Sequence, residues 1–190
     1  LGEFKEKDGD LDLGKHVVVI GGGNTAMDTA RAAKRTKGVE TVSLVYRRTK
    51  RYMPADEEEL LMAVEDGVEF KELLAPVRLE NGRLICRVMK LGDIDDSGRR
   101  GVTETEETRE VLADTVIVAV GEKVPSELYE ANGIHVNERG KAMVREDTCE
   151  TNLEGIYVVG DGLGGPATVV EGIRDGRKAA EAVIGQSLAK

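Results

Sequence analysis

The chain has 190 residues, a net charge of −9 at pH 7 and no tryptophan. An acidic chain is not expected to bind nucleic acid or an anionic membrane in general, and no stretch is long and apolar enough to span a membrane. The two cysteines, Cys86 and Cys149, form no CxxC pair, which excludes a local dithiol motif and favours reduced thiols in the cytoplasm.

The first 14 residues are polar, acidic and glycine-containing, so we interpret residues 1–14 as a linker. The chain opens with leucine rather than methionine. We therefore expect it to be part of a longer protein.

Residues 15–48 predict a strand, a phosphate-binding turn, a helix and a second strand. The apolar run Val17–Ile20 is typical of a parallel strand that is buried on both faces. A helical pattern of small residues follows, and Gly38 is expected to end it. The second strand is predicted at Thr41–Tyr46.

The turn between them, Gly21-Gly22-Gly23-Asn24-Thr25-Ala26, fits the G-x-G-x-x-A dinucleotide-binding pattern, and we call it the glycine turn. Gly21 allows the tight exit from the strand. Gly23 has no Cβ, so a pyrophosphate can approach the backbone, and Ala26 lets the helix pack closely on the strand. The N-terminus of the helix then favours the phosphates. A glycine-rich turn without a ligand is the alternative.

The end of the second strand indicates which nicotinamide cofactor binds. An NAD site places Asp or Glu there to accept hydrogen bonds from the ribose 2′-OH, whereas this chain continues with Arg47-Arg48-Thr49-Lys50-Arg51. We call residues 47–51 the arginine segment. A guanidinium binds two phosphate oxygens at once, so Arg47 and Arg48 predict NADP(H), with Lys50 and Arg51 as supporting charge. A solvated basic loop is the alternative.

A second helix is predicted from Pro54 as the first helical residue, with the acids Asp56–Glu59 in the first turn and Gly67 as its end. These acids are interpreted as surface residues that complement the helix dipole. The expected apolar face consists of Leu60, Leu61 and Val64.

The next region, 68–120, predicts an antiparallel meander appended to the first sheet. Asn81-Gly82 is a strong hairpin signal, and 92–107 is expected to be a long exposed loop. A buried strand is then expected at 114–121. The short strands of the meander are expected at 68–74, 76–79, 84–91 and 110–112.

A second domain is expected from residue 122. Short strands are predicted at 133–136 and 142–144, and an apolar strand at 151–161 ends in Gly160-Asp161. A long helix is predicted from Pro166 to Val183.

Several motifs together resemble the glutamate synthase small-subunit-like flavoproteins, which are NADPH-dependent oxidoreductases with two dinucleotide-binding domains. The resemblance covers nearly the whole chain and implies that NADPH reduces FAD and that electrons pass through iron–sulfur clusters to a partner subunit or domain. The motifs are VIGGGNTAMD at 19–28, YRR at 46–48, MPA at 53–55, AVG at 119–121 and GIYVVGD at 155–161.

The resemblance also implies roles for residues beyond the glycine turn. Gly160-Asp161 is similar to the second flavin motif of the family, in which the Asp binds the ribityl chain. Gly121 and the helix start around Ala167 and Thr168 are implied to contact the cofactors. A simple capping role for Asp161 is the alternative.

One departure from the family limits the expected function. The sequence has no second G-x-G-x-x-G for the ADP half of FAD and no cysteine cluster for iron and sulfur, so FAD binding is expected of the parent protein. The expected fold is α/β. It consists of a Rossmann-like parallel sheet with an antiparallel meander as an NAD(P)H-binding domain at 15–121, and the C-terminal remainder of a FAD-binding domain at 122–190.

Three other functions are alternatives. A non-catalytic dinucleotide-binding or interaction module would lack activity with added FAD and an electron acceptor. A disulfide reductase of the thioredoxin-reductase type requires a CxxC, which is absent. A flavin monooxygenase-like enzyme shares the glycine turn but fits the Met53-Pro54-Ala55 motif less well. No catalytic or metal-binding residue is predicted, because the cofactors carry the chemistry of hydride transfer.

Overall fold

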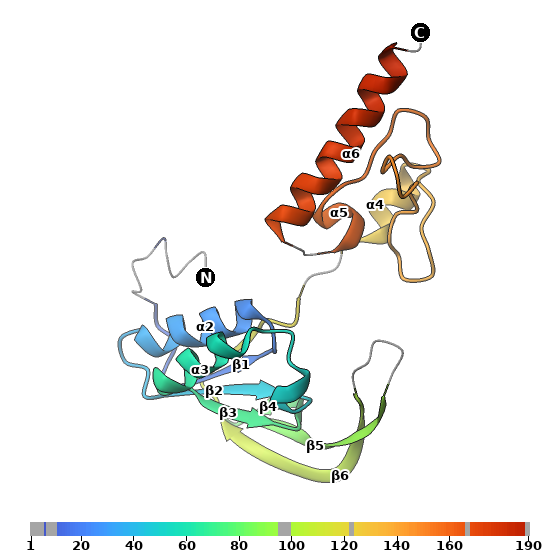
Figure 1. Cartoon of the computed structure of the whole chain (residues 1–190). Coiled ribbons are helices and arrows are strands. Elements are labelled where there is room, and N and C mark those ends of the chain that lie inside the picture. The colour runs from blue at the N-terminus through green and yellow to red at the C-terminus, as the bar shows by residue number, and fades with distance from the viewer. Residues whose placement is uncertain (1–5, 7–10, 95–99, 122–123, 166–167, 189–190) are drawn as a thin grey trace. The chain divides into compact units, whose positions relative to one another are not determined.

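The computed structural model describes residue 6 and residues 11–94, 100–121, 124–165 and 168–188 (Figure 1). The chain divides into two compact units, Leu1–Val120 and Gly121–Lys190. Each unit is described by itself.

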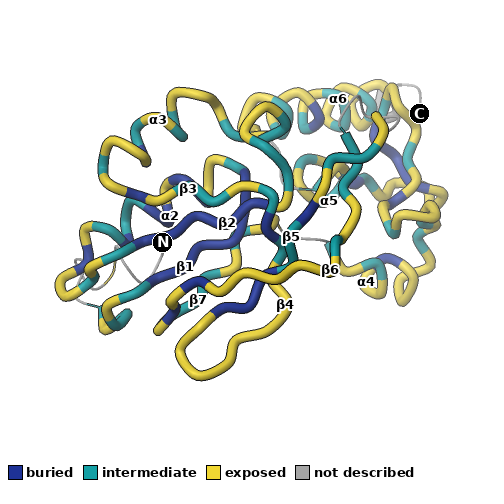
Figure 2. The backbone as a smooth tube through the Cα atoms, turned by 90° about the horizontal axis from the view of Figure 1, so that it is seen from below, coloured by how far each residue is buried: buried dark blue, intermediate teal, exposed yellow. Residues whose placement is uncertain are grey.

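The first unit is built on a parallel sheet of four strands in the order β3-β2-β1-β7. The sheet confirms the predicted α/β class, and its two central strands lie where the sequence predicts them. The burial colouring in Figure 2 shows these central strands as mostly buried. The strands are β1 (His16–Ile20), β2 (Thr41–Tyr46), β3 (Glu69–Glu72) and β7 (Thr115–Val118).

The two faces of the parallel sheet carry different layers. Successive side chains of a strand point to opposite faces, and β1 follows this rule. Val17 and Val19 pack in one cluster with the helices α2 (Asn24–Arg35) and α3 (Glu57–Glu65). Val18 and Ile20 pack in the other cluster, against a second sheet. The apolar run is therefore buried on both faces, as the sequence predicts.

The second sheet is antiparallel, with the order β4-β5-β6. Its first turn has the predicted hairpin geometry, because Asn81 and Gly82 both adopt positive φ values of 50° and 69°. The predicted loop at 92–107 is wrong in large part, since β5 and β6 extend into it as a two-stranded ribbon whose side chains are mostly exposed. Residues 95–99 lie outside the described residues. The strands are β4 (Leu74–Glu80), β5 (Arg83–Ile94) and β6 (Arg100–Leu112).

Two other expectations for strands are wrong. The segment predicted as the first meander strand, 68–74, mainly supplies β3, which pairs in parallel with β2 because α3 forms the crossover between them. The strand predicted as buried, β7, lies at the end of the sheet order, and Val118 is 65% exposed.

The helix α3 begins later than predicted. It starts at Glu57 with Asp56 as its N-cap, so Pro54 is not the first helical residue. Its buried residue is Ala63, which packs in the cluster that contains the alanines of α2. Leu60 is partly buried, but Leu61 and Val64 are 57% and 47% exposed, so the predicted apolar face is wrong in two of its three residues.

The second unit has a small core of Tyr129, Ala142 and Val158. Among the described residues of this unit, the predicted strands are reduced to two isolated bridges, Val136 with Ala142 and Glu150 with Tyr157. The final helix runs from Val169 to Leu188, and the predicted start at Pro166 lies outside the described residues. The helices are α4 (Ser126–Ala131), α5 (Asp161–Gly164) and α6 (Val169–Leu188).

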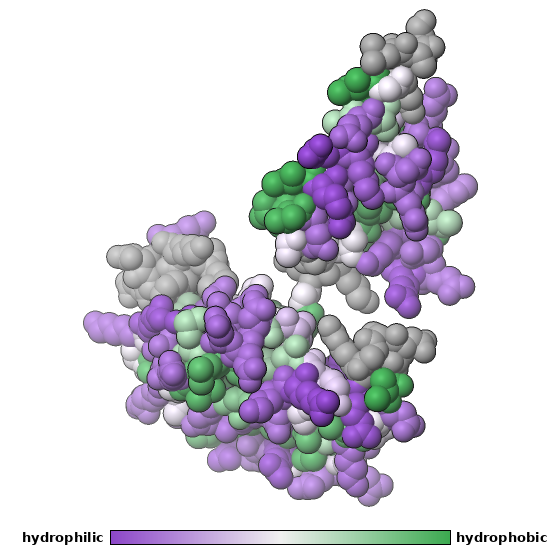
Figure 3. Space-filling view, in the orientation of Figure 1, coloured by the Kyte–Doolittle hydropathy of each residue, from purple (hydrophilic) through white to green (hydrophobic). Residues whose placement is uncertain are grey.

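The surface of α6 is apolar at several places, as Figure 3 shows. Within the part of the chain that the structure describes, no helix combines the length and the apolar character needed to cross a membrane. The exposed apolar side chains of α6 are Val169, Val170, Ile173, Val183 and Ile184.

Candidate functional site

The glycine turn leads from β1 into α2 and is packed from two sides. A Cβ on Gly21 would collide with the carbonyl oxygen of Ala119 and with the side chain of Ala26. A Cβ on Gly22 would collide with the ring of Tyr46, the last residue of β2. Both glycines are therefore required by close packing within the protein.

Gly23 is different from its two neighbours. A Cβ built on this residue meets no atom within 4 Å, so the space in front of it is open. Gly23 is also the N-cap of α2, whose first turn contains no acidic residue. A helix leaves its first N–H groups without partners inside the helix, and its dipole favours anions at this end. The open position thus fits the approach of a phosphate group.

The side chain of Asn24 is hydrogen-bonded to Asp56. Its Nδ2 donates a hydrogen bond of 3.0 Å to Oδ2 of Asp56, and its Oδ1 accepts one of 3.0 Å from the Asp56 backbone N–H. Thr25 is exposed, and its carbonyl accepts a hydrogen bond of 2.6 Å from the Thr29 hydroxyl. Ala26 is fully buried against the strand.

The arginine segment follows β2 and continues into a short 3-10 turn, η1 (Lys50–Tyr52). Arg47 and Arg51 are exposed, whereas Arg48 is half-buried. The Arg48 Nε donates a hydrogen bond of 2.9 Å to the carbonyl oxygen of Arg100, at the start of β6. Arg47 and Arg51 are therefore the more accessible guanidinium groups of the segment.

Residues far away in the sequence hold the arginine segment in place. The Leu73 N–H donates to the carbonyl of Arg48 at 3.2 Å, and the Lys50 N–H donates to the Glu72 carboxylate at 3.1 Å. Sequence reasoning did not identify Glu72 or Arg100. No sequence motif indicates these two residues. They lie near the arginine segment because β3 pairs in parallel with β2 and because β6 begins close to Arg48.

Residues on both sides of the arginine segment contact the glycine turn within the first unit. The Ala55 N–H donates a hydrogen bond of 3.0 Å to the carbonyl of Gly22, and the pair of Asn24 and Asp56 lies beside it. The Tyr46 hydroxyl donates to the Tyr52 carbonyl at 2.8 Å, so the ring that packs on Gly22 is also bound to the residue that follows the segment.

The remaining predicted cofactor-binding residues belong to the second unit. Gly121 has a φ of +92°, which favours glycine. Gly160 has a φ of +58°, and its nearest neighbour in the direction of a Cβ is the Cα of Gly172 in α6, at 3.7 Å. Asp161 is exposed and begins the short helix α5, so it does not end a strand as predicted.

Thr168 is the residue before α6, and its side chain forms a capping box with Glu171. The Thr168 hydroxyl and backbone N–H each donate to a Glu171 carboxylate oxygen at 2.9 Å. These hydrogen bonds, the backbone one first, lower the pKa of Glu171. The Thr168 hydroxyl is thus engaged at the start of the helix, and Ala167 lies outside the described residues.

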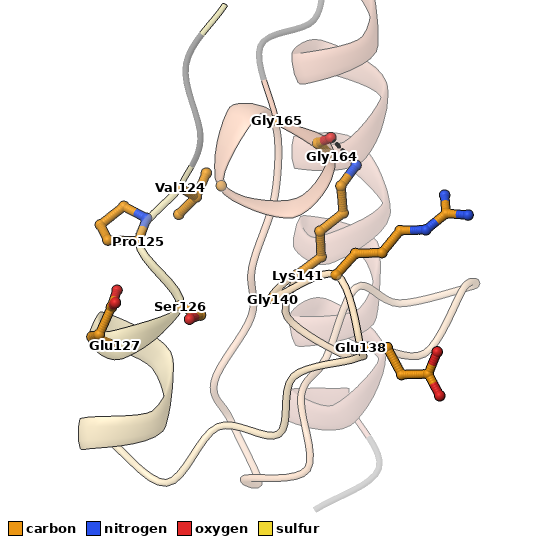
Figure 4. A pocket seen from close by; sticks show the side chains of 11 residues that line it. Val124, Pro125, Ser126, Glu127, Glu138, Gly140, Lys141, Gly164 and Gly165 are labelled. Atoms are coloured by element: carbon orange, nitrogen blue, oxygen red, sulfur yellow. Dashed lines mark hydrogen bonds between the residues drawn. The ribbon is translucent and has the colours of Figure 1, made fainter. Parts of the chain in front are cut away.

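An open cavity of about 960 Å³ lies next to α5 in the second unit (Figure 4). The side chain of Lys141 extends along it and donates a hydrogen bond to the Gly164 carbonyl at the end of α5. Pro125, Glu127 and Glu138 line the opposite and outer parts. The lining is mixed in charge, so it does not form a dedicated anion site.

Neither cysteine is suited to thiol chemistry. Both are buried and unpaired. Burial raises the pKa of Cys86 to about 11 and is also the main cause that raises the pKa of Cys149. A thiol with a raised pKa is a poor nucleophile at neutral pH, so the arrangement does not favour dithiol redox chemistry.

Known proteins resemble this chain over most of its length. It is 45% identical over 175 residues to the putative oxidoreductase YgfK of Escherichia coli K12, covering 92% of this chain and 17% of that protein. It is 38% identical over 201 residues to the glutamate synthase [NADPH] small chain of Azospirillum brasilense, covering 100% of this chain and 41% of that protein. The chain therefore spans less than half the length of either relative.

A solved structure shows the same fold. The complex of Mycobacterium tuberculosis FprA with NADPH superposes with a TM-score of 0.71 at 20% identity, covering 90% of this chain and 52% of that chain. The Pyridine nucleotide-disulphide oxidoreductase family matches residues 2–176. With the glycine turn, the parallel sheet and these relatives in agreement, the chain belongs to the pyridine nucleotide-disulphide oxidoreductase family.

Proposed function

We propose that the chain is the NADPH-binding part of a flavin-dependent oxidoreductase, in which hydride passes from NADPH to FAD and electrons pass on to an accepting subunit or domain. The observation that carries the proposal is the joining of two anion-binding features in one unit. The open face of Gly23 suits a pyrophosphate, and the arginine segment suits a 2′-phosphate.

In this proposal the first unit holds NADPH. The backbone at Gly23 and the N-terminus of α2 bind the pyrophosphate, while Gly21, Gly22 and Ala26 shape the turn. Arg47 and Arg51 bind the 2′-phosphate directly. Arg48 contributes its charge from a side chain that is partly fixed by Arg100.

The second unit is proposed as the C-terminal remainder of a FAD-binding domain. FAD, when bound, supplies the hydride acceptor. Asp161 would accept a hydrogen bond from a ribityl hydroxyl. Thr168 would present the N-terminus of α6, and Gly121 would allow the close approach of a cofactor.

The close packing of Gly160 on α6 and the open cavity beside α5 are compatible with this assignment. The sequence contains no G-x-G-x-x-G for the ADP half of FAD, so turnover is proposed for the full-length protein.

Two relatives carry NADPH or oxidoreductase in their names, which supports the same chemistry here. The proposed partner is an electron-accepting subunit or domain. We propose a cytoplasmic location, which the two buried cysteines without a disulfide support.

The test is a titration of this chain with NADPH and with NADH, in which binding is measured by calorimetry or fluorescence. A lost charge-assisted hydrogen bond costs roughly 1.5–3 kcal/mol. Arg47→Ala should therefore weaken NADPH binding at least about tenfold and leave NADH binding within about twofold. Arg78→Ala is the matched control, because Arg78 is an exposed arginine of the same unit that pairs with Glu80. Equal affinity of the wild-type chain for NADPH and NADH would contradict the assignment of the arginine segment.

A further inference from the structure

Asn24 and Asp56 form a reciprocal pair between the starts of two helices. Asn24 is the first residue of α2, and Asp56 is the N-cap of α3. The side-chain amide of Asn24 donates to the Asp56 carboxylate and accepts from the Asp56 backbone N–H, both at 3.0 Å. Both residues are exposed.

The pairing replaces an interaction that is usual at this position. An Asp at an N-cap normally accepts a hydrogen bond from a backbone N–H of its own helix. The Asp56 side chain makes no such bond to α3, although its carbonyl accepts the N–H of Glu59 at 3.1 Å. The carboxylate accepts a hydrogen bond from Asn24 of the other helix instead. The usual N-cap hydrogen bond within α3 is therefore replaced by a connection between α2 and α3.

The connection lies at the ligand end of the two helices. Asn24 directly follows Gly23, and Asp56 ends the stretch that starts with the arginine segment. The hydrogen bond from Ala55 to Gly22 lies beside the pair. At the other end of the helices, Asp66 accepts hydrogen bonds from Arg31 and Arg35 of α2, at 2.8 and 2.9 Å.

We propose that Asn24 and Asp56 are positioning residues that hold the arginine segment at a fixed distance from the glycine turn. This inference rests on the proposed function, in which one NADPH reaches both places with its pyrophosphate and its 2′-phosphate. A ligand that bridges two subsites gains affinity only when their separation matches the ligand. The pair therefore acts on the simultaneous binding of both phosphates, and Asn24 itself does not touch the cofactor.

Small nucleotides separate the bridging effect from contact with either subsite. The ligand 2′,5′-ADP carries both a 5′-phosphate and a 2′-phosphate, whereas 5′-AMP and 2′-AMP each carry one. Their binding to the wild-type chain and to Asn24→Ala, Asp56→Ala and the double variant is measured by calorimetry, with competition for the weak ligands. Asp56→Asn is the matched control, because its side-chain oxygen still accepts the Asn24 amide.

We expect each single alanine variant to lose about tenfold in affinity for 2′,5′-ADP and to bind 2′-AMP and 5′-AMP within about twofold of the wild type. The double variant should lose no more than Asn24→Ala alone, because that change already removes both hydrogen bonds of the pair, whereas Asp56→Ala keeps the bond from its backbone N–H. Asp56→Asn should retain most of the affinity. Unchanged binding of the single-phosphate ligands also shows that the variants are folded.

Three results would overturn the inference. Equal losses for 5′-AMP and 2′,5′-ADP in Asn24→Ala would mean that Asn24 contacts a phosphate directly. Wild-type affinity for 2′,5′-ADP in both alanine variants would remove any role for the pair. If the wild-type chain binds 2′,5′-ADP no better than 5′-AMP, the NADP(H) proposal itself fails, and the positioning role fails with it.

Discussion

Alanine substitution at Gly22 should lower the stability of the protein, whereas alanine substitution at the neighbouring Gly23 should lower its affinity for NADPH. At Gly22 the new Cβ would lie at or under 3.0 Å from three carbon atoms of the Tyr46 ring. That ring is nearly buried, and its hydroxyl is fixed to the Tyr52 carbonyl at 2.8 Å, so it has little freedom to move away.

The size of the effect follows from these contacts. Extra carbon atoms in a well-packed place typically cost about 1–3 kcal/mol. In a protein of this length, 1 kcal/mol lowers the melting temperature by roughly 2–4 °C, so Gly22→Ala should lower it by about 2–12 °C.

Gly23→Ala should leave the stability nearly unchanged. Its φ of −96° is accessible to alanine, and no atom obstructs the Cβ. The lower chain entropy of alanine in the unfolded state stabilises by about 0.4–1 kcal/mol, which offsets its weaker N-cap preference. The same methyl group would occupy the space proposed for the pyrophosphate, so binding of NADPH should fall strongly.

The assay is thermal unfolding of both variants with and without NADPH, together with a binding titration. Full NADPH affinity in Gly23→Ala would refute the idea that the open space in front of Gly23 receives the pyrophosphate. An unchanged melting temperature in Gly22→Ala would refute the argument from the Tyr46 ring.

Two further predictions concern stability and thiol chemistry. The backbone N–H groups of His16 and Lys15 donate to the Asp114 carboxylate and lower its pKa. The ionised carboxylate therefore stabilises the folded state at pH values above the ordinary pKa of 3.8. This stabilisation is lost as the pH falls through the lowered pKa of the folded state. Urea unfolding between pH 7 and pH 3 should therefore show a weaker acid dependence for Asp114→Asn than for the wild type; an identical dependence would contradict this role. Because burial raises the pKa of Cys86 to about 11, neither it nor the buried Cys149 should react with a thiol reagent at pH 8 in the native protein, whereas both should react in urea. Rapid labelling of either cysteine in the native chain would show that its surroundings open.

Local patterns in the chain were sufficient for the first βαβ unit. Val17–Ile20 is a continuous apolar run, and Thr41–Tyr46 is rich in β-branched and aromatic residues; such segments form central parallel strands where both faces are covered. Asn81-Gly82 was also predictable, because few other residue pairs adopt two positive φ values. The glycine turn and the arginine segment were recognised because their residue types and spacing carry the proposed chemistry directly.

Other features depend on contacts between distant parts of the chain. Nothing in the local sequence places β3 beside β2 or extends the hairpin across residues 92–94 and 100–107. Strand formation depends on the neighbouring strands and on the side chains that pack against them, and these come from distant parts of the chain. The partners of the arginine segment, Glu72 and Arg100, are brought near by this pairing.

The pair of Asn24 and Asp56 illustrates the same division. From the sequence alone, Asn24 is interpreted as part of a nucleotide-binding turn and Asp56 as a residue at the start of a helix. The packing of α3 on α2 brings their side chains together, and hydrogen bonding between them then replaces both local roles. Residue type and spacing therefore predict a dinucleotide as the ligand of the turn, and that remains a proposal. The position of the arginine segment relative to the glycine turn depends on the tertiary structure.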